Sequence, residues 1–105
     1  MRRGDVWWAE LGKPAGHRPV VLLSRNEAYA VRELVTVAPI TTRIRNIPVE
    51  VALGKEDGLP KKCVISLDTI TTIPKRCLKT RIDHLSPLKL KAINDAIRFA
   101  LALGK

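Results

Sequence analysis

The sequence is poor in cysteine. Cys63 and Cys77 are its only two cysteines. Their wide spacing, with no pair of histidines nearby, does not match a zinc site, and a protein in a reducing compartment needs no disulfide. We therefore expect both thiols to be small apolar groups of the core. We also expect the protein to hold no metal and no cofactor.

Aromatic residues and long apolar runs are also scarce. Aromatics make up 4% of the chain, so valine, isoleucine, leucine and alanine must supply most of the core. No apolar segment approaches the roughly 18 residues of a membrane helix, and the N-terminus passes directly from two arginines into an alternating pattern. The sequence predicts neither a signal peptide nor a membrane span, and hence a cytoplasmic protein with no membrane partner.

Acidic residues are outnumbered by basic ones. Ten Asp and Glu stand against 19 Lys and Arg, which gives a formal net charge of +9 and a pI near 10.2. Such an excess favours a polyanionic partner, and nucleic acid is the first candidate. A chain of 105 residues has the size of one domain, so we expect residues 1–105 to form a single domain.

Short apolar segments recur at close spacing along the chain. They are rich in β-branched residues and are separated by turns such as residues 12–16 and 54–60. We expect strands at residues 4–11, 19–24, 34–40, 48–53, 63–67 and 69–73. This pattern favours a β-barrel or sandwich over a parallel sheet. His17 and Arg18 then fall where a loop enters the core, and Thr41 falls just beyond a strand.

The C-terminal segment has helical periodicity. Ser86 can cap the helix and Pro87 suits its first turn. The apolar stripe predicted to pack on the sheet contains Leu90, Ile93, Ile97, Ala100 and Leu101. Gly104 is the predicted stop. A shorter helix, capped by Asn26, is expected within residues 26–32.

Several blocks, in order, resemble the MazF/PemK toxin family. They are residues 3–8 (RGDVWW), 18–24 (RPVVLLS), 37–42 (VAPITT) and 70–73 (ITTI) with Lys75, and they are followed by Leu85, Ser86 and the final helix. The ordered combination spans nearly the whole chain. Two departures stand out: the loop before Arg18 is short, and Thr69 and Thr71 stand where many members carry glutamine and arginine.

The resemblance implies an SH3-like β-barrel of the CcdB/MazF type, mostly β with helices, and usually a homodimer. It implies the toxin of a type II toxin–antitoxin system. Such a toxin cuts single-stranded RNA at short sequences without a metal ion, which inhibits translation and growth. It is silenced by an acidic MazE-like antitoxin. The family's catalytic pair falls on Arg18 and Thr41.

Metal-free cleavage of RNA requires a proton acceptor for the attacking 2′-hydroxyl and groups that stabilise the extra negative charge. Arg18 suits charge stabilisation, because its guanidinium stays charged and presents a fork to phosphate oxygens. Histidine is the side chain whose ordinary pKa suits proton transfer near neutrality, so His17 is the candidate acceptor. An exposed loop histidine is the more common interpretation, and adjacent residues of a strand point to opposite faces. The expected products are a 2′,3′-cyclic phosphate and a 5′-hydroxyl.

The remaining candidates are RNA contacts. Basic side chains track a phosphate backbone and an aromatic ring can stack on a base. The predicted contacts are Trp7, Ser24, Thr42, Arg43, Arg45, Lys61, Lys62, Lys75 and Arg76. Two other functions stay open on the sequence: a CcdB-like toxin that binds a topoisomerase, and a family member that binds RNA without cutting it.

Overall fold

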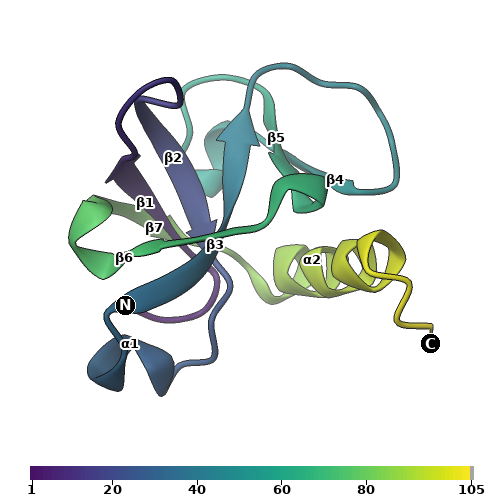
Figure 1. Cartoon of the computed structure of the whole chain (residues 1–105). Helices are drawn as coiled ribbons and strands as arrows, with labels where there is room; N and C mark the ends of the chain where they lie inside the picture. Colours follow the sequence, from purple (N-terminus) through teal and green to yellow (C-terminus); the bar gives the residue numbers. More distant parts are fainter. Residues whose placement is uncertain (105) are drawn as a thin grey trace.

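Seven antiparallel strands dominate the computed structural model, which describes residues 1–104 (Figure 1). The strands are β1 (Asp5–Glu10), β2 (His17–Leu22), β3 (Leu34–Thr41), β4 (Glu50–Leu53), β5 (Cys63–Ser66), β6 (Thr71–Pro74) and β7 (Leu78–His84). They follow the order β4-β5-β3-β2-β1-β7, and β6 pairs with β3. The sheet is open, with β4 and β7 at its ends, and this barrel-like arrangement with a C-terminal helix confirms the predicted fold class.

Two helices and three short turns complete the described chain. The helices are α1 (Ala28–Val31) and α2 (Pro87–Ala100), and the 3-10 turns are η1 (Lys55–Asp57), η2 (Leu67–Thr69) and η3 (Lys75–Cys77). Figure 1 shows α2, in yellow, well separated from α1, and α2 packs against β4 and η2. Among residues 1–104, neither helix is long and apolar enough to cross a membrane.

The central strands are buried on both faces, which explains their unbroken apolar runs. In β2, Val21 belongs to one core cluster, while Val20 and Leu22 belong to the other. Helix α2 covers the first cluster with Ile93 and Ala96. The second cluster is lined in part by Tyr29 and other apolar side chains of the sheet. Each strand face thus has an apolar layer against it.

The start of α2 is as predicted, but its end is not. Ser86 caps the helix, since its side chain accepts a hydrogen bond from the Lys89 amide, and Pro87 occupies the first turn. The helix ends at Ala100, before the predicted stop at Gly104, and Ala102 just beyond it adopts a positive φ of 55°. The amides of Ala102 and Leu103 bond back to the carbonyls of Phe99 and Arg98, the Schellman pattern. The prediction that Leu101 belongs to the apolar stripe is therefore wrong, because Leu101 lies beyond the helix and is exposed.

The structure also corrects two predictions about local elements. Asn26 does not cap α1, because its Oδ1 accepts a hydrogen bond from the Arg3 amide at 2.7 Å. Strand β7 was not expected, since its sequence LKTRIDH shows little apolar alternation. It forms because β1 supplies a full-length antiparallel partner, interrupted by two register shifts. The position of such a strand is determined by its pairing with a neighbouring strand and depends little on the β propensity of its own residues.

Candidate active site

Arg18 and Thr41 lie on the neighbouring strands β2 and β3, just beyond the part where these two strands pair. The β2–β3 register pairs Val20 with Pro39, and continuing it by two residues sets Arg18 opposite Thr41. Directly opposed residues of an antiparallel pair project to the same face of the sheet. Both residues belong to strands: Arg18 lies in β2 and not in a loop, and Thr41 is the last residue of β3 and does not follow it.

Two cavities meet at this pair. The first, which we call the apolar cavity, has a volume of about 260 Å³. It is lined by Trp8, Arg18, Pro19, Ile40, Thr41, Thr42, Leu59, Pro60, Lys61 and Cys63. The second, the polar cavity, measures about 200 Å³. It is lined by Arg18, Pro39, Thr41, Arg43, Arg45, Ile47, Val49, Glu50, Ser66, Asp68 and Thr69. Arg18 and Thr41 are the residues that the two cavities share.

Local hydrogen bonds orient the shared pair. The Nε of Arg18 donates to the carbonyl of Ala15 in the β1–β2 loop, with a separation of 3.2 Å. This leaves the terminal nitrogens of the guanidinium free to bind an anion. The Oγ1 of Thr41 accepts a hydrogen bond from the Arg43 amide at 3.1 Å. The hydroxyl proton of Thr41 therefore remains available for a ligand.

His17 is not among the residues that line either cavity, and two contacts hold its ring. Its ring stacks on Trp8 with centroids 4.7 Å apart and planes 9° apart. Its Nδ1 lies 2.7 Å from Oε1 of Glu10. A carboxylate at Nδ1 favours the tautomer whose Nε2 lone pair is free. Trp8 itself lines the apolar cavity, so this stack joins His17 to the cavity wall.

Glu50 organises the loop that carries two of the predicted RNA contacts. Its Oε1 accepts hydrogen bonds from the amides of Arg45 and Asn46, both at 2.9 Å. Asn46 sits at a positive φ of 57° inside this turn. The segment between β3 and β4 is thereby folded so that Arg43 and Arg45 line the polar cavity. Sequence reasoning missed Glu50, because a single carboxylate at the start of a strand, next to a basic loop, gives no motif.

The structure gathers only part of the predicted set. Arg18, Thr41, Thr42, Arg43, Arg45 and Lys61 line one or both cavities. Trp7, Ser24, Lys62, Lys75 and Arg76 are not among the residues that line either cavity. Strand alternation explains why Trp7 lies outside the cavities while Trp8 lines one of them, since adjacent residues of a strand point to opposite faces. Trp8, paired with Pro19, is therefore the aromatic residue of the site.

Two of the predicted contacts outside the cavities, Ser24 and Lys75, have partners within the protein. The Oγ of Ser24 accepts from the Thr36 amide at 2.8 Å, and the Ser24 carbonyl accepts from the Tyr29 hydroxyl at 3.0 Å. Burial raises the pKa of Tyr29 to about 12. The Nζ of Lys75 donates to the Tyr29 carbonyl at 2.7 Å. This group therefore ties α1 to the sheet.

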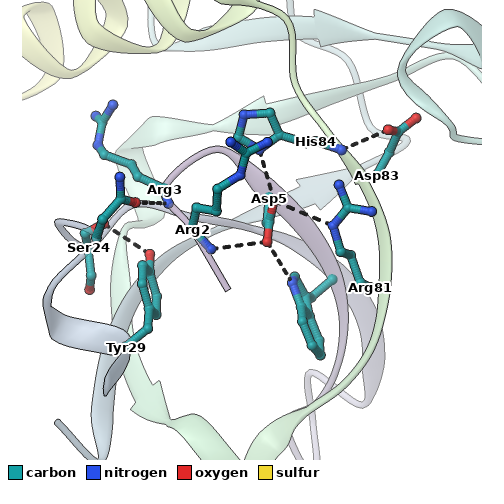
Figure 2. A network of polar contacts seen from close by, with 10 residues as sticks. Arg2, Arg3, Asp5, Ser24, Tyr29, Arg81, Asp83 and His84 are labelled. Carbon is teal, nitrogen blue, oxygen red and sulfur yellow. Dashed lines mark hydrogen bonds and ion pairs between the residues drawn. The ribbon is translucent and has the colours of Figure 1, made fainter. Parts of the chain in front are cut away.

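A second polar cluster joins the N-terminal segment to β7 (Figure 2). The carboxylate of Asp5, only 2% exposed, lies at its centre. Its Oδ1 is 2.8 Å from Nδ1 of His84 and 3.6 Å from Nε of Arg81. Its Oδ2 accepts from the Arg2 amide at 3.1 Å and from Nε1 of Trp7 at 3.4 Å. Sequence analysis did not pair these residues, because 79 positions separate Asp5 from His84.

The Asp5 carboxyl has a shifted pKa. Burial raises its pKa, but the hydrogen bonds from His84, the Arg2 amide and Trp7, together with the charge of Arg81, outweigh burial and bring it below its ordinary value of 3.8. The cluster lines neither cavity described above. We therefore assign this cluster a role in stabilising the fold.

The cysteines and metal-ligand residues form no centre in the described part of the chain. Both cysteines are free thiols; Cys63 is buried and Cys77 is partly buried. Burial raises the pKa of the Cys63 thiol. Across residues 1–104, no group of three or more His, Cys, Asp or Glu side chains is arranged to hold a metal ion.

Comparison with known proteins identifies the family to which the chain is similar. The model of the PemK-like, MazF-like toxins of type II toxin–antitoxin systems matches residues 2–101. An endoribonuclease MazF of Staphylococcus saprophyticus is 39% identical over 111 residues, and the match covers 98% of this chain and 92% of that protein.

Solved structures of related proteins have the same fold. The Mycobacterium tuberculosis toxin MazF-mt6 superposes with a TM-score of 0.90 at 34% identity, covering 96% of this chain and 99% of that one. A mycobacterial endoribonuclease solved in complex with its cognate antitoxin gives a TM-score of 0.88 at 30% identity, covering 100% of this chain and 98% of that one. The similarity extends over essentially the whole described chain.

Proposed function

This chain belongs to the PemK-like, MazF-like toxin family of type II toxin–antitoxin systems, and from that premise we propose that it is a single-domain, cytoplasmic endoribonuclease that cuts single-stranded RNA without a metal ion. The observation that carries the proposal is that Arg18 and Thr41 both line both cavities. An RNA strand running through the two cavities has its scissile phosphate at this pair.

Arg18 and Thr41 stabilise the charge that develops at the phosphate. The guanidinium of Arg18 presents a rigid cationic fork to two non-bridging oxygens. The Thr41 hydroxyl donates to one of these oxygens while its oxygen accepts from the Arg43 amide. Arg18 does not serve as the proton acceptor, because a guanidinium stays protonated in proteins.

We assign the proton acceptor to His17. With Glu10 at Nδ1, the free Nε2 lone pair takes the proton of the 2′-hydroxyl. The 2′-oxygen then forms a bond to phosphorus, and the bond from phosphorus to the 5′-oxygen breaks. Its electron pair leaves with the 5′-oxygen, which takes up a proton from water, and His17 returns its proton to the solvent. The products are a 2′,3′-cyclic phosphate and a 5′-hydroxyl end.

The charge of the chain fits the partners of such a toxin. A net charge of +9 attracts RNA and equally an acidic peptide. One mycobacterial relative was solved with its cognate antitoxin, and we propose that this chain is neutralised by an acidic MazE-like antitoxin. We further propose that it acts as a homodimer and that cutting messenger RNA inhibits translation and growth.

The proposed activity is tested by incubating the purified protein with a long single-stranded RNA in EDTA and mapping the new ends. We expect cuts at defined sequences with cyclic-phosphate and 5′-hydroxyl ends. RNA that is bound but stays intact would instead support a non-cleaving RNA-binding protein. RNA that is neither bound nor cut would favour a CcdB-like topoisomerase inhibitor. Cuts that require added Mg²⁺ would contradict the metal-free mechanism.

Replacing His17 separates proton transfer from stacking. His17→Phe keeps an aromatic ring against Trp8 but removes the proton acceptor, so we expect cleavage at neutral pH to fall about 100-fold. His17→Ala, which removes both functions, is expected to be at least as slow. The measurement is the single-turnover rate with a short RNA across a pH series. If His17→Phe cleaves at the wild-type rate with an unchanged pH profile, then His17 is only a stacking partner of Trp8.

A further inference from the structure

The polar cavity carries an unusual charge pattern for a surface that binds RNA. Arg18, Arg43 and Arg45 suit phosphate oxygens, yet the carboxylates of Glu50 and Asp68 line the same cavity. A carboxylate close to a phosphate costs binding free energy, unless it accepts hydrogen bonds from another part of the ligand. The presence of each of these two carboxylates in the cavity therefore requires an explanation.

Contacts within the protein explain the presence of Glu50 in this cavity. Its Oε1 already accepts from the amides of Arg45 and Asn46, both at 2.9 Å. Asp68 has no such partner: among residues 1–104, no ion pair within 4.0 Å and no side-chain hydrogen bond involves its carboxylate. Asp68 is exposed, so water solvates it until a ligand enters. In the described part of the chain, Asp68 is thus the carboxylate of this cavity for which no side-chain partner is found.

The neighbours of Asp68 supply a compact polar wall. Asp68 lies in the turn η2 between Ser66 at the end of β5 and Thr69. The Oγ1 of Thr69 donates to Oγ of Ser66 at 3.1 Å. The hydroxyl proton of Ser66 is therefore free to donate to a ligand. Hydrogen-bond acceptance by a carboxylate and donation by a hydroxyl are the two functions needed to recognise the edge of a base.

The four bases differ in how they satisfy a free carboxylate. Cytosine, adenine and guanine each carry an exocyclic amino group on an edge that proteins read in single-stranded RNA. Uracil offers a single N–H between two carbonyl oxygens, and these oxygens repel a carboxylate. The polar cavity shares Arg18 and Thr41 with the proposed cleavage site, so the nucleotide within it adjoins the scissile phosphate.

We infer that Asp68 determines the base at one position next to the cut and selects a base with an exocyclic amino group over uracil. This inference rests on the proposed ribonuclease function and extends it to sequence specificity. The base on the other side of the cut occupies the apolar cavity, whose lining contains no carboxylate. That base is held by packing against Trp8, so its identity does not depend on Asp68.

The experiment compares cleavage sites in a single-stranded RNA pool with randomised sequence. Wild type, Asp68→Asn and the matched control Asp95→Asn, which removes the same charge from α2, are each digested in EDTA, and the 5′-hydroxyl ends are sequenced. Wild type and Asp95→Asn are expected to disfavour uracil at one flanking position by about 10-fold. Asp68→Asn is expected to lose that bias and shift toward uracil, whose oxygens accept from the new amide. Preference at the other flanking position should not change.

The outcomes separate this inference from the function on which it rests. If wild type leaves all RNA intact, the proposed function fails, and the inference fails with it. If wild type cuts but prefers uracil at both flanking positions, or if Asp68→Asn keeps the wild-type bias, only the inference about Asp68 is overturned.

Binding provides a second readout that needs no cleavage. Short RNAs with a 2′-O-methyl group at the cut site and either cytosine or uracil at the recognised position can be titrated against each protein. We expect wild type to bind the cytosine RNA about 10-fold more tightly and Asp68→Asn to lose this difference. Equal affinities with wild type would contradict the inference.

Discussion

Replacement of Arg18 by alanine is expected to lower the rate of RNA cleavage by about 1000-fold. The reason is that Arg18 is the cation common to the linings of both cavities, which it shares with Thr41. Its side chain makes one hydrogen bond within the protein, from Nε to Ala15. Its removal should therefore affect the phosphate in the transition state far more than the fold. The measurement is the single-turnover rate with a saturating short RNA.

Two further variants test whether charge alone explains the loss. Arg18→Lys keeps the charge but replaces the planar fork by a single ammonium, so we expect a rate between wild type and Arg18→Ala. Arg98→Ala removes an equal charge from α2, where Arg98 pairs with Asp95 at 3.4 Å, and should leave cleavage within a few-fold of wild type. A rate for Arg18→Ala within about 10-fold of wild type would remove Arg18 from the mechanism.

Replacement of Asp5 by alanine is expected to have the largest effect on stability, lowering the free energy of unfolding by about 3 to 5 kcal/mol. Asp5 is 2% exposed, and its loss leaves the imidazole of His84 and the Arg2 amide without their acceptor. Urea unfolding near neutral pH measures the change. Asp5→Asn, which keeps the volume, should lie between Asp5→Ala and wild type. Asp95→Ala, on the exposed face of α2, should cost under about 1 kcal/mol.

Acidification tests the same carboxylate without a substitution. The pKa of Asp5 is lowered in the folded protein, so below pH 3.8 the unfolded chain binds more protons than the folded one. The stability that this carboxylate contributes is fully present above pH 3.8 and is lost as the pH falls through the folded pKa. Asp5→Ala should lose that part of the acid dependence. An acid unfolding profile for Asp5→Ala parallel to that of wild type would contradict the assignment.

The sequence by itself determined the elements whose residues carry a local signal. β2 and β3 were predicted because unbroken apolar runs with β-branched residues suit strands buried on both faces. The start of α2 was predicted because Ser86 and Pro87 act within one helical turn. The resemblance to the family, in blocks that keep their order, identified Arg18 and Thr41 before their register was known.

Tertiary structure alone decided what depends on contacts between distant segments. Strand β7 exists through its pairing with β1, although its own residues are largely polar and charged. The register of β1 places Trp8, and not Trp7, at the site, because a shift of one residue moves every side chain of a strand to the opposite face. The basic residues could not be sorted by sequence, since a charge carries no information about position. Asp68 and Glu50 carry no motif, and only the fold brings their carboxylates beside Arg18 in one cavity.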